Sequence, residues 1–270
     1  MIYQEKVSVQ IAAYRPEHIE ETILSVINQN CEEWELVILI DGPPEKNLKR
    51  INEVIKKYIN NKKIKVYFQE NRGSGATRKK LYKITNCKYV LPIDDDDMLC
   101  SNAVSEVLKC FKENPNASIV KAGHKSIKEW EKINLPIILS NHFQPIMRKR
   151  VHGMTTNLTY VDQLWCFNKE LYDKVEEVKL SEEAKYVGVE IELFLKMEEL
   201  GPIVWIPKML YIKREWPDQI TERPDFPVNL TKYCIRVGQE AAKRRGLDVR
   251  LIWDVGFRVY ENKGRREEKK

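Results

Sequence analysis

Apolar residues recur with two different periods along the first third of the chain. Four stretches rich in β-branched and aromatic residues favour buried strands: 7–12, 34–40, 64–68 and 89–93. Between them, around 19–27 and 48–58, apolar residues recur at helical spacing, and a basic helix is expected after the third strand. Because strands that alternate with helices build parallel sheets covered on both faces, the pattern predicts an α/β fold with a mostly parallel central sheet.

The strand at 89–93 runs directly into four consecutive aspartates, Asp94 to Asp97. Two carboxylates about 4 Å apart repel each other by roughly 4 kcal/mol at an effective dielectric constant of about 20, so the run predicts a cation. Ligands that are all oxygen favour Mg²⁺ or Mn²⁺, which usually also hold substrate phosphates. In the alternative, the run is a solvated acidic turn. In either case we assign Asp97 a role as cap of the next helix.

Each of the four predicted strands ends on a polar or glycine-containing element. Tyr14 follows the first strand, Asp41 the second, the loop 71–75 the third, and Asp94 the fourth. Parallel strands place these ends along one edge of the sheet, where a nucleotide can bind. The glycine-rich dinucleotide fingerprint and the P-loop motif are both missing from the sequence, which argues against those two nucleotide-binding folds.

The same stretches, in the same order, resemble the family 2 glycosyltransferases, which have the GT-A fold. The resemblance covers residues 7–115 closely and recurs around 186–207. It implies inverting transfer of a sugar from a nucleotide diphosphate donor, which we expect to be a UDP-sugar. It also implies one nucleotide-sugar-binding domain at 1–216, with a donor half at 1–123 and an acceptor half at 124–216. Residues 217–270 would form a C-terminal extension, first helical and then a charged tail.

The resemblance assigns roles to eight residues of the donor half. Three of them would line the base pocket, two would approach the donor, one would contact the ribose, and two would hold Mn²⁺ or Mg²⁺ on the diphosphate. In that order they are Ala12, Tyr14 and Asp41, then Arg72 and Arg78, then Asp95, then Asp94 and Asp96. Asp41 would read the uracil edge. Trp216 stands where the family often has a metal-binding histidine, so the resemblance supplies no third metal ligand.

A helical pattern at 186–200 supplies the candidate general base. The resemblance places Glu190 at the base position, where it would take the acceptor proton, and Glu192 is the competing candidate. Residues two apart on a helix face different directions, so only one of the two can serve. The alternative for Glu190 is a first-turn carboxylate that stabilises the helix dipole.

The second half of the chain gives weaker patterns. Residues 117–122 and 160–167 predict two further strands, and the irregular region between them is our candidate for acceptor contacts. A helix is expected at 230–245 and a frayed tail at 261–270, while 249–260 has no decisive pattern.

Composition indicates in which cellular compartment we expect the protein. The chain has 270 residues, a net charge of +6 and six cysteines without a C-x-x-C pair, which predicts reduced thiols. We find no apolar run long enough to span a membrane and no signal-peptide pattern, so we expect a cytoplasmic protein.

The sequence therefore predicts a metal-dependent inverting glycosyltransferase. Its acceptor stays open among a glycan, a peptide, a small molecule and a modified nucleic acid. The alternatives are a nucleotidyltransferase, which also uses carboxylates and a metal, and a catalytically inactive protein that only binds nucleotide sugars.

Overall fold

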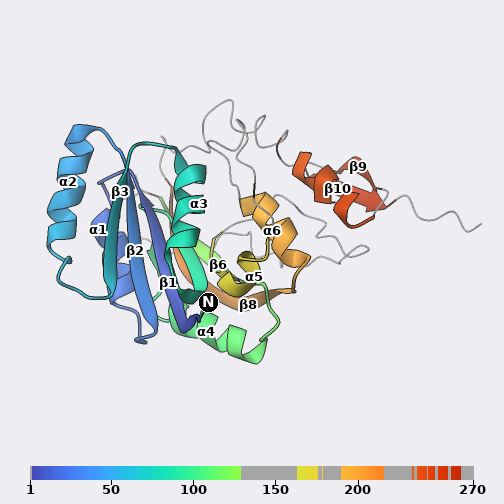
Figure 1. Ribbon diagram of the computed structural model, residues 1–270, viewed down its shortest axis with the longest axis horizontal. Coiled ribbons are helices and arrows are strands. Elements are labelled where there is room, and N and C mark those ends of the chain that lie inside the picture. Colours follow the sequence, from blue (N-terminus) through green and yellow to red (C-terminus); the bar gives the residue numbers. More distant parts are fainter. Residues whose placement is uncertain are drawn as a thin grey trace, which may run out of the picture.

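The computed structural model describes residues 2–128, 163–175, 178, 190–215, 233, 236–241, 243–246, 249–254 and 257–262. Within these residues, one eight-stranded sheet has the strand order β3-β2-β1-β4-β7-β6-β8-β5. Figure 1 shows β3, β2 and β1 of this sheet side by side. Its strands are β1 (Gln4–Ala13), β2 (Trp34–Asp41), β3 (Ile64–Gln69), β4 (Cys87–Ile93), β5 (Met98–Leu99), β6 (Ile119–Lys128), β7 (Trp165–Asn168) and β8 (Ile203–Glu215). The helices are α1 (Ile19–Ile27), α2 (Glu45–Lys56), α3 (Ser74–Ile84), α4 (Ala103–Glu113), α5 (Lys169–Tyr172) and α6 (Glu190–Glu198).

The first four strands form the parallel half of the sheet. β1 pairs with β2 on one side and with β4 on the other, and β2 pairs with β3, all in parallel. Each of these strands is joined to the next by a helix, as the alternating pattern of the sequence predicted. All four strands therefore end at the same edge, as the sequence predicted.

The other strands form a mixed half. β7 runs antiparallel to both β4 and β6, β8 is parallel to β6, and the short β5 is antiparallel to β8. The four aspartates form the turn between β4 and β5, and β5 begins directly after Asp97, where it pairs with β8. The mixed half thereby brings β8, far along the sequence, next to the acidic segment.

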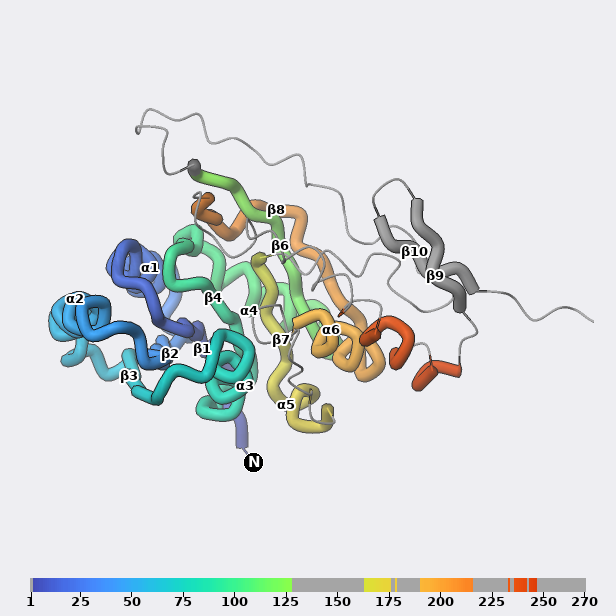
Figure 2. Tube along the Cα trace, turned by 90° about the horizontal axis from the view of Figure 1, so that it is seen from above, coloured from blue at the N-terminus to red at the C-terminus, as the bar shows by residue number. Residues whose placement is uncertain are grey.

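Helices cover both faces of the sheet because the strands alternate their apolar residues between the two faces. Val7, Val9 and Ile11 of β1 pack in one core with α1, α2 and α4. Val90 of β4 packs in a second core with α3, α6 and the β7 aromatics, among them Trp165. Viewed along the sheet in Figure 2, α1 and α3 lie on opposite sides of β1.

Several sequence-based boundaries shift in the second half. β6 extends to Lys128, six residues beyond the predicted strand end, and β7 begins only at Trp165. Residues 233, 236–241, 243 and 244 are helical, as expected for 230–245. The stretch without a decisive pattern forms an antiparallel hairpin of β9 (Val249–Asp254) and β10 (Phe257–Asn262), so the first two residues of the expected tail belong to a strand.

Other expectations fall on residues outside the described part. They include the irregular region from residue 129 onward, the first residues of the helix predicted at 186–200, and Trp216. Among the described residues, every helix is too short or too polar to cross a membrane. The five described cysteines are free thiols, in agreement with the sequence.

Candidate functional site

The ends of β1, β2 and β4 bring the predicted site residues together. Ala13 of β1 lies beside Ile40 of β2, and Ile11 lies beside Ile93 of β4. The next residues along the three strands are Tyr14, Asp41 and Asp94, which therefore leave the sheet at one edge. Tyr14 is 38% exposed at this edge.

Asp95 fastens the acidic segment to the end of β1. Its Oδ2 accepts hydrogen bonds from the backbone N–H groups of Tyr14, at 2.7 Å, and Arg15, at 2.8 Å. Burial and the neighbouring charge of Asp96 raise the pKa of Asp95 to about 7, and the two backbone hydrogen bonds oppose that rise. Its expected contact with a ribose stays a prediction. What the structure adds is a role in shaping the loop.

Asp97 fastens the same segment to β8. Its Oδ2 accepts a hydrogen bond from the Tyr211 hydroxyl at 2.6 Å, and its Oδ1 accepts one from the backbone N–H of Arg214 at 2.7 Å. Burial and the charges of Asp94 and Asp96 raise its pKa. The expectation that Asp97 caps the next helix is wrong, because α4 begins after Asn102 and Asp97 is used by the sheet.

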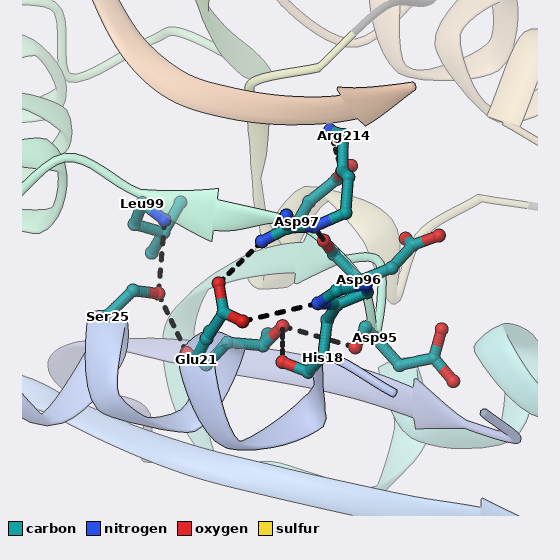
Figure 3. A network of polar contacts seen from close by, with 9 residues as sticks. His18, Glu21, Ser25, Asp95, Asp96, Asp97, Leu99 and Arg214 are labelled. Carbon is teal, nitrogen blue, oxygen red and sulfur yellow. Dashed lines mark hydrogen bonds and ion pairs between the residues drawn. The ribbon is translucent and has the colours of Figure 1, made fainter. Parts of the chain in front are cut away.

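Arg214 links three elements around the acidic segment (Figure 3). Its Nε donates to the backbone carbonyl of Asp96 at 3.1 Å, and its Nη2 contacts Glu21 Oε2 of α1 at 2.6 Å. Glu21 in turn contacts His18 Nδ1 at 3.2 Å. A single arginine thereby joins the end of β8, the loop after β4 and the first turn of α1.

Arg78 of α3 stands between the predicted metal ligand and the predicted base. Its guanidinium donates to Asp94 through Nη2 and to Glu190 through Nη1. The side chains of Arg78 and Glu190 are 18% and 8% exposed, so solvent screens this contact only weakly. The charges of Glu190 and Asp94 raise the pKa of Arg78, whereas its burial acts in the opposite direction. The structure thus brings Arg78, Asp94 and Glu190 together, although they come from positions far apart in the sequence.

Asp41 at the end of β2 is almost completely buried, and Oδ1 makes its hydrogen bonds. Oδ1 accepts from Gln69 Nε2 at 2.7 Å and from the backbone N–H of Arg72 at 2.9 Å. Arg72 is exposed at the start of the loop that leads to α3. Ala12 packs partly buried against Val37, Leu39 and Leu81 under the same edge.

The competing base candidate, Glu192, faces another environment. It pairs with Lys196 one turn later on α6 at 3.0 Å, and its Oε2 is buried without a hydrogen-bond partner among the described residues. Its charge also helps to raise the pKa of the buried Tyr233, although desolvation of that phenol is the larger cause. Glu192 therefore lies within the core around α6, whereas Glu190 reaches Arg78 and through it the acidic segment.

The donor set suits a small hard cation. Among the described residues no group of three or more His, Cys, Asp and Glu side chains converges as a complete metal cage. Mg²⁺ and Mn²⁺ commonly take one or two protein carboxylates and complete their shell with water and substrate phosphates. Asp94 and Asp96, which project two residues apart from the end of a parallel strand, fit that mode of binding.

Sequence reasoning missed three residues that shape the site: Tyr211, Arg214 and Gln69. Tyr211 and Arg214 belong to β8, and nothing in the sequence pattern shows that β8 lies beside β5. Gln69 could have been predicted from the sequence, because it directly follows the strand expected at 64–68, and a polar side chain there reaches the same edge as Asp41.

Comparisons with known proteins agree with this fold. The family model described as glycosyl transferase family 2 matches residues 8–175, more than half of the chain. An uncharacterized glycosyltransferase, MJ1057 of Methanocaldococcus jannaschii, is 30% identical over 42% of this chain and 40% of its own length. EpsJ of Bacillus subtilis, also an uncharacterized glycosyltransferase, is 25% identical over 82% of this chain and 64% of its own length.

Solved structures show the same fold. S. aureus TarS 1-349 in complex with UDP-GlcNAc superposes with a TM-score of 0.61 at 17% identity, covering 86% of this chain and 66% of that one. This chain covers only part of its curated relatives: 40%, 22% and 64% of the lengths of the first three. The match of the family model over more than half of the sequence places this chain in glycosyl transferase family 2.

Proposed function

We propose that this glycosyltransferase uses a UDP-sugar, assisted by Mn²⁺ or Mg²⁺, and inverts the anomeric carbon with Glu190 as general base. The observation that carries the proposal is the link from Asp94 through Arg78 to Glu190. Through this link, Glu190, which we propose as the base, and Asp94, which we propose as a ligand of the cation, contact the same guanidinium. TarS, which shares the fold, has been solved with UDP-GlcNAc and with UDP, which supports a uridine donor.

The nucleoside would lie across the ends of β1 and β2. The ring of Tyr14, a residue that is partly exposed at this edge, would stack on the base, and the Asp41 carboxylate would accept a hydrogen bond from the imide N–H of uracil. Ala12 would form the floor of this pocket and Arg72 would approach the donor from its rim. In this arrangement Asp95, whose Oδ2 is used by the backbone, would meet the ribose with its other oxygen.

The diphosphate would lie over the acidic segment. Asp94 and Asp96 would hold the cation, which supplies positive charge against the departing diphosphate. Arg78 contacts Asp94, and a guanidinium at this position would also interact with phosphate oxygens. Asp95 and Asp97 keep the segment in position through their bonds to β1 and β8.

Glu190 would act on the acceptor. Its carboxylate takes the proton of the acceptor nucleophile while that atom forms a bond to the anomeric carbon from the face opposite the diphosphate. The bond from the anomeric carbon to the diphosphate oxygen breaks, and its electron pair leaves with the diphosphate. The contact with Arg78 fixes the orientation of Glu190 at the start of α6, so the base is positioned before the acceptor arrives.

A donor screen tests this function. The protein is incubated with a panel of UDP-, GDP- and CDP-sugars plus Mn²⁺, and release of nucleoside diphosphate is followed without acceptor. We expect slow hydrolysis of one UDP-sugar and loss of that signal with EDTA. Release from GDP- or CDP-sugars alone would overturn the uridine assignment. Binding of UDP without any turnover, even with glycan, peptide, small-molecule and RNA acceptors added, would favour the inactive binding protein.

A further inference from the structure

We infer that Gln69 determines which nucleobase the donor pocket accepts, because it fixes the direction in which Asp41 presents its carboxylate. This inference rests on the proposed uridine donor and assigns a role to a residue that does not itself touch the base. It concerns a positioning residue at the end of β3, beside Asp41 in the register of the sheet.

Gln69 connects Asp41 to the first turn of α3. Its Nε2 donates both to Asp41 Oδ1 at 2.7 Å and to Thr77 Oγ1 at 2.9 Å. The Thr77 hydroxyl donates in turn to the backbone carbonyl of Gly73 at 2.9 Å. One amide hydrogen of Gln69 therefore points to the Asp41 carboxylate, and the other points to α3.

The charge of Asp41 fixes the orientation of the Gln69 amide. If the amide turned over, its carbonyl oxygen would face the carboxylate, and two acceptors would oppose each other. The observed orientation leaves Gln69 Oε1 buried without a hydrogen-bond partner among the described residues. Leaving a buried acceptor unpaired costs free energy, so the contact with Asp41 outweighs that loss.

The hydrogen bonds on Asp41 are one-sided. Oδ1 receives Gln69 Nε2 and the backbone N–H of Arg72, whereas the described residues give Oδ2 no hydrogen bond. Oδ2 also does not belong to the fully buried polar atoms that lack a hydrogen-bond partner, so it keeps some contact with solvent. Oδ2 is therefore the oxygen that remains for a ligand, and Gln69 keeps Oδ1 turned away from it.

The backbone around Asp41 cannot easily adjust. Gly42 has a φ of +48°, and a Cβ at this position would come within 2.5 Å of the Asn71 backbone nitrogen. The turn after β2 is thus packed directly against the loop after β3. With the backbone fixed on both sides, the direction of the Asp41 side chain depends on its hydrogen-bond partners.

A carboxylate held in this way distinguishes nucleobases by whether their N3 position carries a hydrogen. An ionised carboxylate only accepts hydrogen bonds, and the N3 position of uracil carries a hydrogen. The N3 position of cytosine carries a lone pair instead, so cytosine placed in the same way would set two acceptors against each other. Selection is sharp only while Oδ2 is held in one direction, and Gln69 supplies that restraint.

Titration calorimetry with UDP and CDP tests the inference. Gln69→Leu keeps the bulk of the side chain and removes the amide, so Asp41 can rotate and offer either oxygen. We expect the UDP-to-CDP affinity ratio to fall about tenfold, close to the effect of one hydrogen bond, chiefly through weaker UDP binding. Gln69→Glu places a second carboxylate against Asp41 and should lower UDP affinity further than Gln69→Leu does.

Two further measurements separate positioning from a merely structural role. Thermal unfolding of each variant reports damage to the fold, and Gln4→Leu, at the exposed start of β1, is the control for the substitution itself. If Gln69→Leu weakens UDP and CDP equally, or lowers the melting temperature with an unchanged ratio, Gln69 does not set the specificity. If the wild type binds neither nucleotide, or prefers CDP or GDP, the uridine proposal fails first and independently.

Discussion

The two halves of the sheet contribute to the site in different ways. In the parallel half, Tyr14, Asp41 and Asp94 reach the site simply because parallel neighbours end at the same edge. In the mixed half, Tyr211 and Arg214 reach it because β8 lies next to β5, a pairing between segments more than a hundred residues apart. The parallel half supplies the groups that we expect to touch the donor, and the mixed half supplies groups that hold them.

The four aspartates divide along the same line. The carboxylates of Asp95 and Asp97 accept hydrogen bonds from backbone N–H groups at the ends of β1 and β8. They therefore fix the shape of the acidic segment. Asp94 faces the cationic side chain of Arg78, and through it the segment meets Glu190 of α6. Asp95 and Asp97 therefore have a structural role, whereas Asp94 and Asp96 are the pair that we propose to hold the cation.

The largest effect that we expect concerns Glu190, the link between the two halves. Glu190→Gln keeps the size of the side chain but removes the group that takes the proton. Since a positioned base contributes about 10²–10⁴-fold, we expect that loss in transfer rate. UDP affinity, measured by calorimetry, should move by less than about 0.5 kcal/mol, because the base acts on the acceptor.

Glu192→Gln is the matched control on the same helix. Glu192 pairs with Lys196 and belongs to the core around α6, so the transfer rate should stay near that of the wild type. Loss of transfer in Glu192→Gln with normal rates in Glu190→Gln would reverse the assignment of the base. Normal rates in both variants would place the base elsewhere.

The sequence predicted the parallel half nearly in full because its information is local. Each strand and helix there has its own apolar period, and connections between adjacent parallel strands fix the order of the ends. That order alone predicts that Tyr14, Asp41 and the acidic segment meet at one edge, whereas their roles toward a donor came from the family resemblance. The expectation for Asp97 failed because a polar residue before a helix is a common cap, and only the neighbouring β8 shows that its carboxylate is already used.

The mixed half was harder to predict because its decisive contacts are long-range. Nothing in the pattern of 203–215 distinguishes a strand that ends beside the acidic segment from a strand at another edge. The contact between Arg78 and Glu190 likewise depends on how α6 packs against α3, a question of side-chain fit rather than of period. Only the family resemblance pointed to Glu190 in advance.

The second expected effect is on stability, and it compares Asp97 with Asp94. Asp97→Ala leaves the Tyr211 hydroxyl and the Arg214 N–H without their acceptor, and each buried donor left unpaired costs roughly 1–3 kcal/mol. Asp94→Ala removes an ion pair whose carboxylate is 38% exposed, so its cost should stay below about 1 kcal/mol. Urea unfolding of both variants measures the difference, and equal losses would contradict the division of the aspartates.

The smallest effect concerns the cation. If Asp96 holds the metal against the diphosphate, Mn²⁺ should strengthen UDP binding in the wild type, and Asp96→Ala should lose most of that gain. Loss of a residue that only hydrogen-bonds to a metal ligand typically lowers metal affinity by about 10–100-fold. Loss of a direct ligand should therefore reduce the gain in UDP affinity from Mn²⁺ by at least about tenfold. UDP affinity in EDTA should stay unchanged, because other residues are proposed to contact the base and the ribose. Glu113→Ala, an exposed carboxylate on α4, is the control and should behave as the wild type. Equal Mn²⁺ dependence in Asp96→Ala and the wild type would remove Asp96 from the metal site and leave Asp94, the neighbour of Arg78, as the carboxylate to test next.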